Sequence, residues 1–396
     1  MTEPLIITLK TLTPLWTGGA DGRSDRLHTT GIIGSLRWWY EAIVRGLGGY
    51  ACDPTSEKAD ERSEFDTKAY EQAKREKLSE IEVLQAGLKT LCPVSYLFGT
   101  TGWARLFQMQ AINIPTTPLH FRTSLPMNQS WLKRVFGGES QNIDNLRVPH
   151  GELELRFVPR GHAAEYAQSQ FLLALRFAID YGGLGARLQH GFGQCNLVVP
   201  TDLQTQDIAY GLAQLANHLA INDLRSSGTQ RVTPFDLRNF VSLTYDVSGT
   251  SLSAFRTHCG SSQKANEQNY LPCAFDLRYK GSGKWGMRRW LEDPNGAKKW
   301  EQKNINNLMG VSEKKGEKIN DEDRQAGHLY FGMPYRLTNG IYRLRIFGFA
   351  PPDLLTPEQL NTLTQAYMKY ALNMEPQQVT LGKELIAKVK GVKHGA

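Results

Sequence analysis

The sequence lacks a long uninterrupted apolar run. No window of about 18 consecutive apolar residues occurs in the 396-residue chain, which excludes an ordinary membrane-spanning helix. Residues 1–10 lack a basic stretch followed by an apolar run that ends in small residues, so no secretory signal is expected. Cysteine is scarce, with five widely spaced residues, which is an odd number. This usage suits a reducing cytoplasm and argues against a disulfide framework, and we expect a cytoplasmic protein.

Strong charge of one sign is absent as well. The chain has 46 Lys and Arg residues against 39 Asp and Glu residues, a net charge of +7. Residues 1–200 carry +1 and residues 201–396 carry +6, while residues 55–82 hold nine acidic and six basic side chains. Such a chain could bind a polyanion on one side, or it could have a solvated surface with a slight basic bias.

Motifs for common cofactors and hydrolases are missing. The Gly-Ser-Gly-Lys run in Lys280–Gly286 is followed by Trp285 where a nucleotide-binding loop needs Ser or Thr, so ATP binding is rejected. His258, Cys259 and Cys273 lack the paired spacing of metal ligands. Neither Gly-x-Ser-x-Gly nor His-Glu-x-x-His occurs. We therefore expect no cofactor.

Hydrophobic periodicity predicts a repeated order of strands and helices. In residues 1–200 the predicted strands are Leu5–Leu12, Arg105–Ile114, Glu152–Val158 and Cys195–Val199, and the predicted helices are Gly31–Leu47 and Glu165–Tyr181. This order is the ferredoxin-like β-α-β-β-α-β arrangement. It leaves one sheet face free, and RRM domains bind nucleic acid on that face. A charged helical insertion is expected at about 54–90.

The second half repeats the pattern more weakly. The predicted helices are Asp207–Leu219 and Pro357–Leu372, and the predicted strands are Phe240–Val247 and Ile341–Phe349. An irregular insertion is expected at about 250–325. The predicted fold class is α+β, with two tandem ferredoxin-like domains at 1–200 and 201–396 that carry helical and irregular insertions. Two domains also agree with the chain length.

The most specific local feature is the glycine-rich loop, Gly182–Gly193 (GGLGARLQHGFG), of which five residues are glycine. It lies between a predicted helix and a predicted strand, so it is not the strand-to-helix dinucleotide fingerprint. Glycine permits positive φ and close approach of another backbone. Arg187, Gln189 and His190 inside the loop could meet phosphates or base edges. The alternative is a flexible turn that ends the helix.

A basic loop and helix form the second candidate. Gly18, Arg23 and Arg26 lie in the loop before the first predicted helix, and Arg37 and Arg45 are expected on its exposed face. The neighbouring Trp38 and Trp39 point about 100° apart. We expect Trp39 in the core and Trp38 against an insertion or a partner, since plain packing is favoured over base stacking for both.

The third candidate is the basic-aromatic stretch Arg278–Lys303. It has eight basic and three acidic side chains with aromatic residues between them, and Lys284, Arg288 and Arg289 are its candidate contacts. Phosphate neutralisation together with base stacking is the means by which single-stranded nucleic acid is bound. A basic insertion covering a subunit joint would have the same composition.

Four segments together resemble the RAMP superfamily of CRISPR effector subunits. They are Leu12–Gly19 (LTPLWTGG), Gly31–Leu47 (GIIGSLRWWYEAIVRGL), Gly182–Gly193 and His328–Leu337 (HLYFGMPYRL). The resemblance is strongest to the first RAMP subunit of the type III-B, or Cmr, complex, and it covers about half the chain. It implies two ferredoxin-like RAMP domains in a non-catalytic subunit for antiviral defence, placed at the 3′ end of the guide RNA. The implied partners are guide RNA, target RNA and neighbouring RAMP subunits, without a membrane.

The resemblance also implies which residues border the RNA. Carried over, it nominates Gly18, Arg23, Arg26, Arg37 and Arg45 together with Arg187, Gln189 and His190. Target cleavage in this family is assigned to backbone subunits with a loop aspartate, and nothing marks Asp21 or Asp25 here as catalytic. Two alternatives remain open: a metal-independent endoribonuclease that uses His190 or His28, and a scaffold whose basic surfaces contact acidic proteins.

Overall fold

The computed structural model describes residues 4–18, 24, 26–54, 56–58, 60–118, 147–161, 163–198, 208–221, 224–225, 233–258, 274, 276–278, 286–293, 299–311 and 326–391. Among the candidate residues, Arg23 and Lys284 lie outside the described residues, and so do Asp21 and Asp25. Within the described ranges, no helix is long and apolar enough to cross a membrane.

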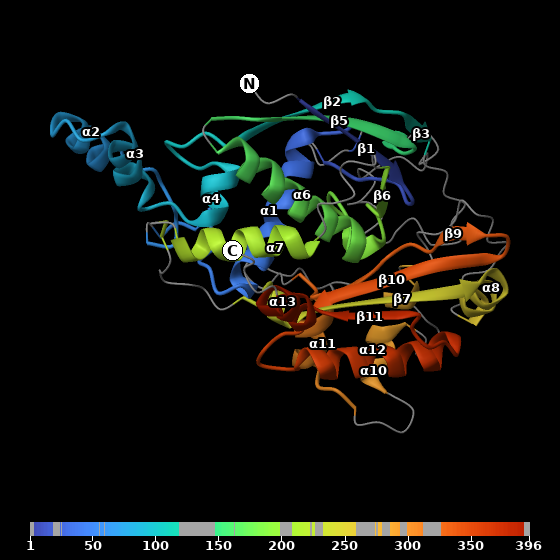
Figure 1. Ribbon diagram of the computed structural model, residues 1–396. Helices are drawn as coiled ribbons and strands as arrows, with labels where there is room; N and C mark the ends of the chain where they lie inside the picture. Colours follow the sequence, from blue (N-terminus) through green and yellow to red (C-terminus); the bar gives the residue numbers. More distant parts are fainter. Residues whose placement is uncertain are drawn as a thin grey trace.

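The first sheet is antiparallel and has the strand order β2-β5-β1-β6. Its strands are β1 (Leu5–Thr11), β2 (Phe107–Asn113), β5 (Glu152–Pro159) and β6 (Cys195–Val198). Alternate residues of β1 are apolar, and Ile7 and Leu9 lie opposite Leu155 and Leu153 of β5 on the buried face. Helices α1 (Thr29–Gly46) and α6 (Ala164–Tyr181) cover that face, as Figure 1 shows. A separate small sheet pairs β3 (Thr116–Pro118) with β4 (Arg147–Pro149).

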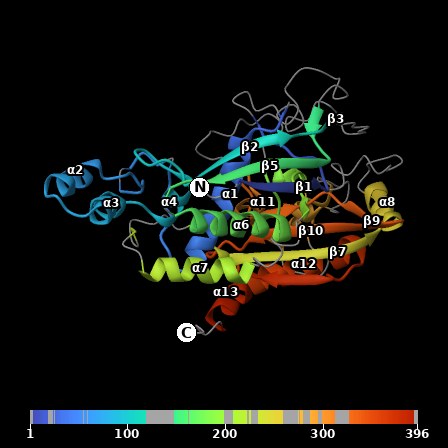
Figure 2. The ribbon, with the colours of Figure 1, turned by 45° about the horizontal axis from the view of Figure 1, so that its top comes forward.

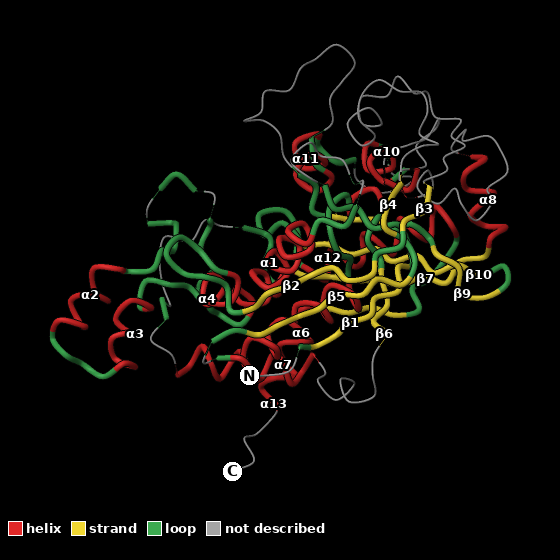
Figure 3. The backbone as a smooth tube through the Cα atoms, turned by 90° about the horizontal axis from the view of Figure 1, so that it is seen from above, coloured by secondary structure: helices red, strands yellow, loops and turns green. Residues whose placement is uncertain are grey.

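The outer face of the first sheet has no described helix over it (Figure 3). Its strands present these side chains outward: Ile6, Thr8, Lys10, Gln108, Gln110, Glu152, Glu154, Arg156, Val158, Asn196 and Val198. None of these is aromatic. RRM domains bind bases by stacking them on aromatic side chains of the corresponding face. These four strands therefore lack the side chains for RRM-type base stacking.

The second sheet has the order β11-β7-β10-β8, and β9 pairs with β10. Its strands are β7 (Phe240–Ser248), β8 (Leu329–Phe331), β9 (Tyr335–Thr338), β10 (Ile341–Phe349) and β11 (Gln378–Leu381). Helices α8 (Gly249–His258), α10 (Met287–Glu292), α11 (Gln302–Met309) and α12 (Pro357–Leu372) supply its second core.

The predicted irregular insertion at about 250–325 is wrong for the part that the structure describes. Leu252, Leu277, Met287 and Leu308 come from this stretch, and all four are buried in the second core. The helices α8, α10 and α11 have only 10, 6 and 8 residues, so each is too short for its apolar spacing to stand out in the sequence.

The two sheets are separated by the helices of the first half (Figure 1). One continuous core contains Trp39 of α1 together with Phe240, Phe347 and Phe349 of the second sheet. Helix α7 (Ile208–Ile221) packs on α6, and α13 (Gly382–Gly391) packs on α7. A 3₁₀ turn, η4 (Leu237–Asn239), leads into β7. Helix α1 is therefore covered on two sides.

The acidic insertion forms an arm that projects from the body (Figure 2). It consists of α2 (Thr67–Arg75) and α3 (Glu80–Leu88), and α4 (Pro93–Phe98) follows at its base. Asp66 caps α2, and Ser79 with Glu82 forms a capping box on α3. The predicted helical character of this insertion is confirmed.

Candidate nucleic-acid interface

The chain leaving β1 holds the glycine-rich loop along its length. The Thr13 hydroxyl donates to the Gly191 carbonyl at 3.1 Å and accepts from the Gln194 amide at 3.0 Å. The Ala186 amide donates to the Trp16 carbonyl at 2.8 Å. These bonds satisfy buried polar groups at both ends of the loop. The glycine-rich loop is therefore hydrogen-bonded near both of its ends to the chain that leaves β1.

Helix α1 contacts the same loop from the other side. The Ser35 hydroxyl accepts from the Gly185 amide at 3.0 Å, and the Trp39 indole donates to the Gly183 carbonyl at 2.9 Å. At Gly182 an added Cβ would lie 2.2 Å from the Trp39 ring. Close approach to α1 therefore requires glycine there, independently of any ligand.

The loop also contacts the second half of the chain. The Met333 amide donates to the Gly191 carbonyl at 3.2 Å, and the Gln194 side chain donates to the Met333 carbonyl at 2.7 Å. Gly191 has φ +89°, and its added Cβ would lie 2.4 Å from the Met333 nitrogen. The four segments that carry the family resemblance therefore meet at one joint between the two sheets.

Two candidate arginines lie in segments that contact the chain after β1. The Thr17 hydroxyl donates to the Arg26 carbonyl at 3.1 Å, and its neighbour Trp16 accepts from Ala186, which precedes Arg187. Arg26 is exposed, and Arg187 is half-buried in the left-handed conformation with φ 62°. The segments that carry these two basic residues therefore hydrogen-bond to the adjacent residues Thr17 and Trp16.

Gln189 and His190 lie within the short 3₁₀ turn η2 (Leu188–His190). Gln189 is half-buried, whereas His190 is only 7% exposed. His28 is half-buried just before α1. Gly18, the last residue of the described range 4–18, is also half-buried. Burial of His190 counts against its use as a general acid or base on a bound strand.

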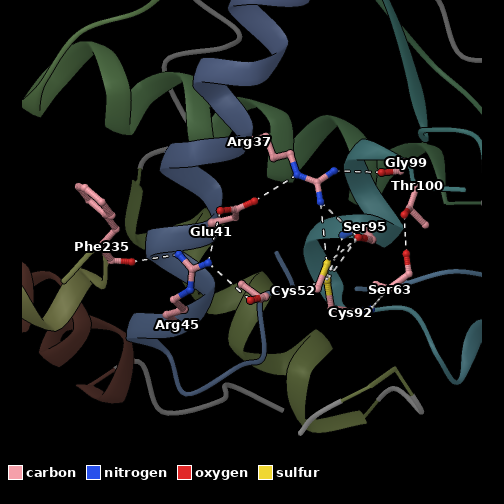
Figure 4. A network of polar contacts seen from close by, with 11 residues as sticks. Arg37, Glu41, Arg45, Cys52, Ser63, Cys92, Ser95, Gly99, Thr100 and Phe235 are labelled. Atoms are coloured by element: carbon pink, nitrogen blue, oxygen red, sulfur yellow. Dashed lines mark hydrogen bonds and ion pairs between the residues drawn. The ribbon is translucent and has the colours of Figure 1, made fainter. Parts of the chain in front are cut away.

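Arg37 and Arg45 are not on an exposed helix face, so that expectation is wrong. The Arg37 guanidinium donates to Glu41 at 3.1 Å and to the Gly99 carbonyl at 3.0 Å, and Arg45 donates to the Phe235 carbonyl at 3.1 Å (Figure 4). Their side chains are only 16% and 10% exposed. The base of the arm and the segment before β7 cover this face.

Glu41 lies between the two guanidinium groups. Burial raises the pKa of its carboxyl above the usual value, while Arg45 and Arg37 act in the opposite direction. Two cations share one carboxylate, and backbone carbonyls accept their remaining hydrogen bonds. The arrangement connects α1 to distant segments and presents little charge to solvent.

Comparison with known families now gives the N-terminal half an assignment. Residues 8–196 match the family described as the RAMP superfamily. The chain contains a RAMP-superfamily domain. No curated protein matches the sequence.

Two solved structures are similar to the chain. The crystal structure of Cmr1 from Pyrococcus furiosus, in its apo form, has 13% sequence identity and a TM-score of 0.44, over 96% of this chain and 99% of that chain. A cryo-EM structure of the type III-B Cmr-beta bound to cognate target RNA has 12% identity and a TM-score of 0.46, over 92% of this chain and 100% of that chain.

Outside the RAMP domain, the described residues of the basic-aromatic stretch (278, 286–293 and 299–303) do not form one exposed strip. Arg288 is buried and donates to the Gly310 carbonyl at 2.7 Å and to Asn306. Trp290 is part of the second core. Arg289 is exposed and forms an ion pair with Glu292 at 2.7 Å. The α10 segment alternates between core and surface because it is an amphipathic helix.

Trp38 also differs from its expectation. Its ring lies 4.7 Å from the Trp39 ring, and it contacts Phe235 and Phe349 at the same core. Two neighbouring tryptophans can share a core here because the RAMP domain packs α1 against the second sheet as well as the first.

Sequence reasoning missed the residues that fix the loop of the RAMP domain. They are Thr13, Ser35, Gln194 and Met333. The Thr13 hydroxyl beside Pro14 is a turn signal that pointed to Thr13. Gln194 and Met333 act through contacts 139 residues apart, for which a single sequence has no local signal.

Proposed function

We propose that this chain is a non-catalytic RNA-binding subunit of a type III-B CRISPR effector complex that acts in antiviral defence. It would sit at the 3′ end of the guide RNA and contact guide RNA, target RNA and neighbouring RAMP subunits in the cytoplasm. The RAMP domain and the four motif segments support this proposal. RNA binding and the position in the complex are inferred from the geometry of the joint and from the family resemblance.

We also propose that both halves are ferredoxin-like domains. In the first half, α1 follows β1 and α6 follows β5, and the strand order is β2-β5-β1-β6. In the second half, α12 follows β10, and the order is β11-β7-β10-β8. With β9 left out of the count and the first sheet read from β6, each sheet places its fourth, first, third and second strands side by side, which supports a repeated β-α-β-β-α-β fold.

The proposal of RNA binding depends on Arg26 and Arg187. Arg26 hydrogen-bonds through its backbone to Thr17, and Ala186, which precedes Arg187, hydrogen-bonds to the neighbouring Trp16. Guanidinium groups neutralise phosphates and release counterions from a nucleic-acid strand. Arg37, Arg45 and Arg288 contribute less to this proposal, because their side chains are largely withdrawn from solvent.

Charge reversal tests this interface. In the double variant Arg26→Glu/Arg187→Glu, single-stranded guide RNA should bind more weakly, and the slope of log affinity against log salt should become shallower by about 1.4, at about 0.7 per phosphate contact. The matched control is Lys369→Glu/Lys383→Glu, which changes the net charge equally on α12 and α13. Equal slopes for the two double variants would refute the interface.

The non-catalytic assignment has its own test. The purified chain is incubated with CRISPR repeat RNA in the presence of a chelator, and the products are separated on a denaturing gel. The proposal requires intact RNA. Specific cleavage that is lost in His190→Ala would establish the endoribonuclease instead.

A further inference from the structure

Two cysteines lie in contact at the base of the arm. The Sγ atoms of Cys52 and Cys92 are 3.1 Å apart, and both residues are buried (Figure 4). Cys52 follows α1, and Cys92 precedes α4, so the pair brackets the segment that forms the arm. Two free thiols that are 40 residues apart in sequence are thus in contact through their sulfur atoms.

The surroundings of the pair favour a thiolate on one side. The Cys92 sulfur accepts from the Ser95 amide at 3.4 Å and from the Cys52 amide at 3.5 Å, and the Arg37 guanidinium lies 4.0 Å from the Cys52 sulfur. Burial raises the pKa of the Cys92 thiol, but hydrogen bonds from Cys52 and Ser95 outweigh burial and lower it below its ordinary value. The hydrogen bond with Cys92, together with burial, raises the pKa of Cys52.

We propose that Cys52 and Cys92 are a redox modification site that forms a reversible disulfide across the base of the arm. A disulfide requires sulfurs at about 2.05 Å, so the two atoms need to approach by only about an ångström. Cys195, the remaining described cysteine, donates instead to the Gly193 carbonyl at 3.6 Å, and its thiol has a pKa raised by burial to about 12. It therefore lacks the partner and the thiolate that the pair has.

The oxidant is hydrogen peroxide. The Cys92 thiolate attacks one peroxide oxygen, the O–O bond breaks, and the hydroxide that leaves takes up the proton lost by the Cys92 thiol and becomes water. The Cys52 thiol then attacks the sulfenic sulfur, forms the S–S bond and releases a second water, with its own proton included. Two thiols are oxidised to one disulfide and one hydrogen peroxide is reduced to two waters, and two equivalents of a small thiol reverse the change by thiol–disulfide exchange.

The disulfide would close a covalent loop around the whole arm. The same atoms connect to Ser95, and through Arg37 to Glu41 and Arg45 of α1. Oxidation would therefore fix the direction in which the arm leaves the body, independently of whether the interface at Arg26 and Arg187 binds RNA.

A cut in the arm makes the disulfide visible. A recognition sequence for a site-specific protease is inserted after Lys77, in the exposed turn between α2 and α3. The full chain is treated with hydrogen peroxide, blocked with N-ethylmaleimide, cut and run in SDS without reductant. Most of the cut chain should migrate as one species, and it should separate into two pieces when reductant is added.

Variants identify the sulfurs. The tether should be lost in Cys52→Ser and Cys92→Ser and retained in the control Cys195→Ser. Mass spectrometry of the wild-type digest should show a Cys52–Cys92 cross-linked peptide, a readout that does not depend on any variant folding. Separation of the pieces after peroxide without reductant, or a tether that persists in Cys92→Ser, would overturn the proposal.

Discussion

The contact between Gly191 and Met333 predicts a large loss of stability for a single added methyl group. In Gly191→Ala the new Cβ would lie 2.4 Å from the Met333 nitrogen, at φ +89°. The left-handed conformation costs a non-glycine residue about 1–2 kcal/mol, and overpacking costs about 1–3 kcal/mol more. The free energy of unfolding should therefore fall by about 2–5 kcal/mol.

The same substitution in α1 supplies the control. Gly34 is helical and exposed, and an added Cβ there meets no atom within 4 Å. Gly34→Ala should raise the free energy of unfolding by about 0.5–1 kcal/mol, because alanine loses less backbone entropy in a helix. Urea unfolding followed by tryptophan fluorescence compares the midpoints of the two variants. A Gly191→Ala midpoint at or above that of the wild type would refute the assignment of this loop as a packed joint.

Three further predictions address individual side chains. Thr13→Val removes a buried hydroxyl that bridges the glycine-rich loop, so urea unfolding should show a loss of about 1–3 kcal/mol. Burial lowers the pKa of His218 to about 4 from 6.5, so its stabilising contribution is complete above pH 6.5 and is lost as the pH falls toward 4. His218→Phe keeps the stack on Tyr166 and should flatten the midpoint–pH curve in that range; an unchanged curve would contradict the reasoning. Arg288→Ala should lower the free energy of unfolding by about 1–3 kcal/mol, because it removes a buried hydrogen bond. Arg289→Ala should change the same free energy by less than about 0.5 kcal/mol, because its ion pair is exposed. Thermal unfolding compares the two variants, and equal losses would contradict the two environments described.

Regular elements were predictable where local signals agree. The strand Ile341–Phe349 and the helix Pro357–Leu372 are confirmed at both ends. Proline in the first turn, a Thr356 capping box and alternating apolar residues all point the same way in these segments. Short strands such as β8 and β11 were missed because three or four residues have no readable period.

The environment of charged residues was not predictable in the same way. Arg37 and Arg45 have the spacing of a solvated helix face, and that spacing alone predicted exposure. Their hydrogen-bond partners lie far along the chain: Gly99 is 62 residues from Arg37, and Phe235 is 190 residues from Arg45. Only the tertiary fold brings these carbonyls to α1. The glycine-rich loop was located correctly by its composition, whereas its contacts with Met333 are equally non-local.

Coverage of α1 on two sides has a consequence for dissecting this protein. The RAMP match ends at residue 196, yet Trp39 lies against Phe347 and Phe240, which belong to the later half of the chain. A fragment truncated near residue 200 would expose that aromatic surface to water, and an exposed apolar surface of this kind promotes aggregation. The smallest piece suitable for recombinant expression is therefore set by the aromatic contacts of α1 and extends beyond the border of the sequence family.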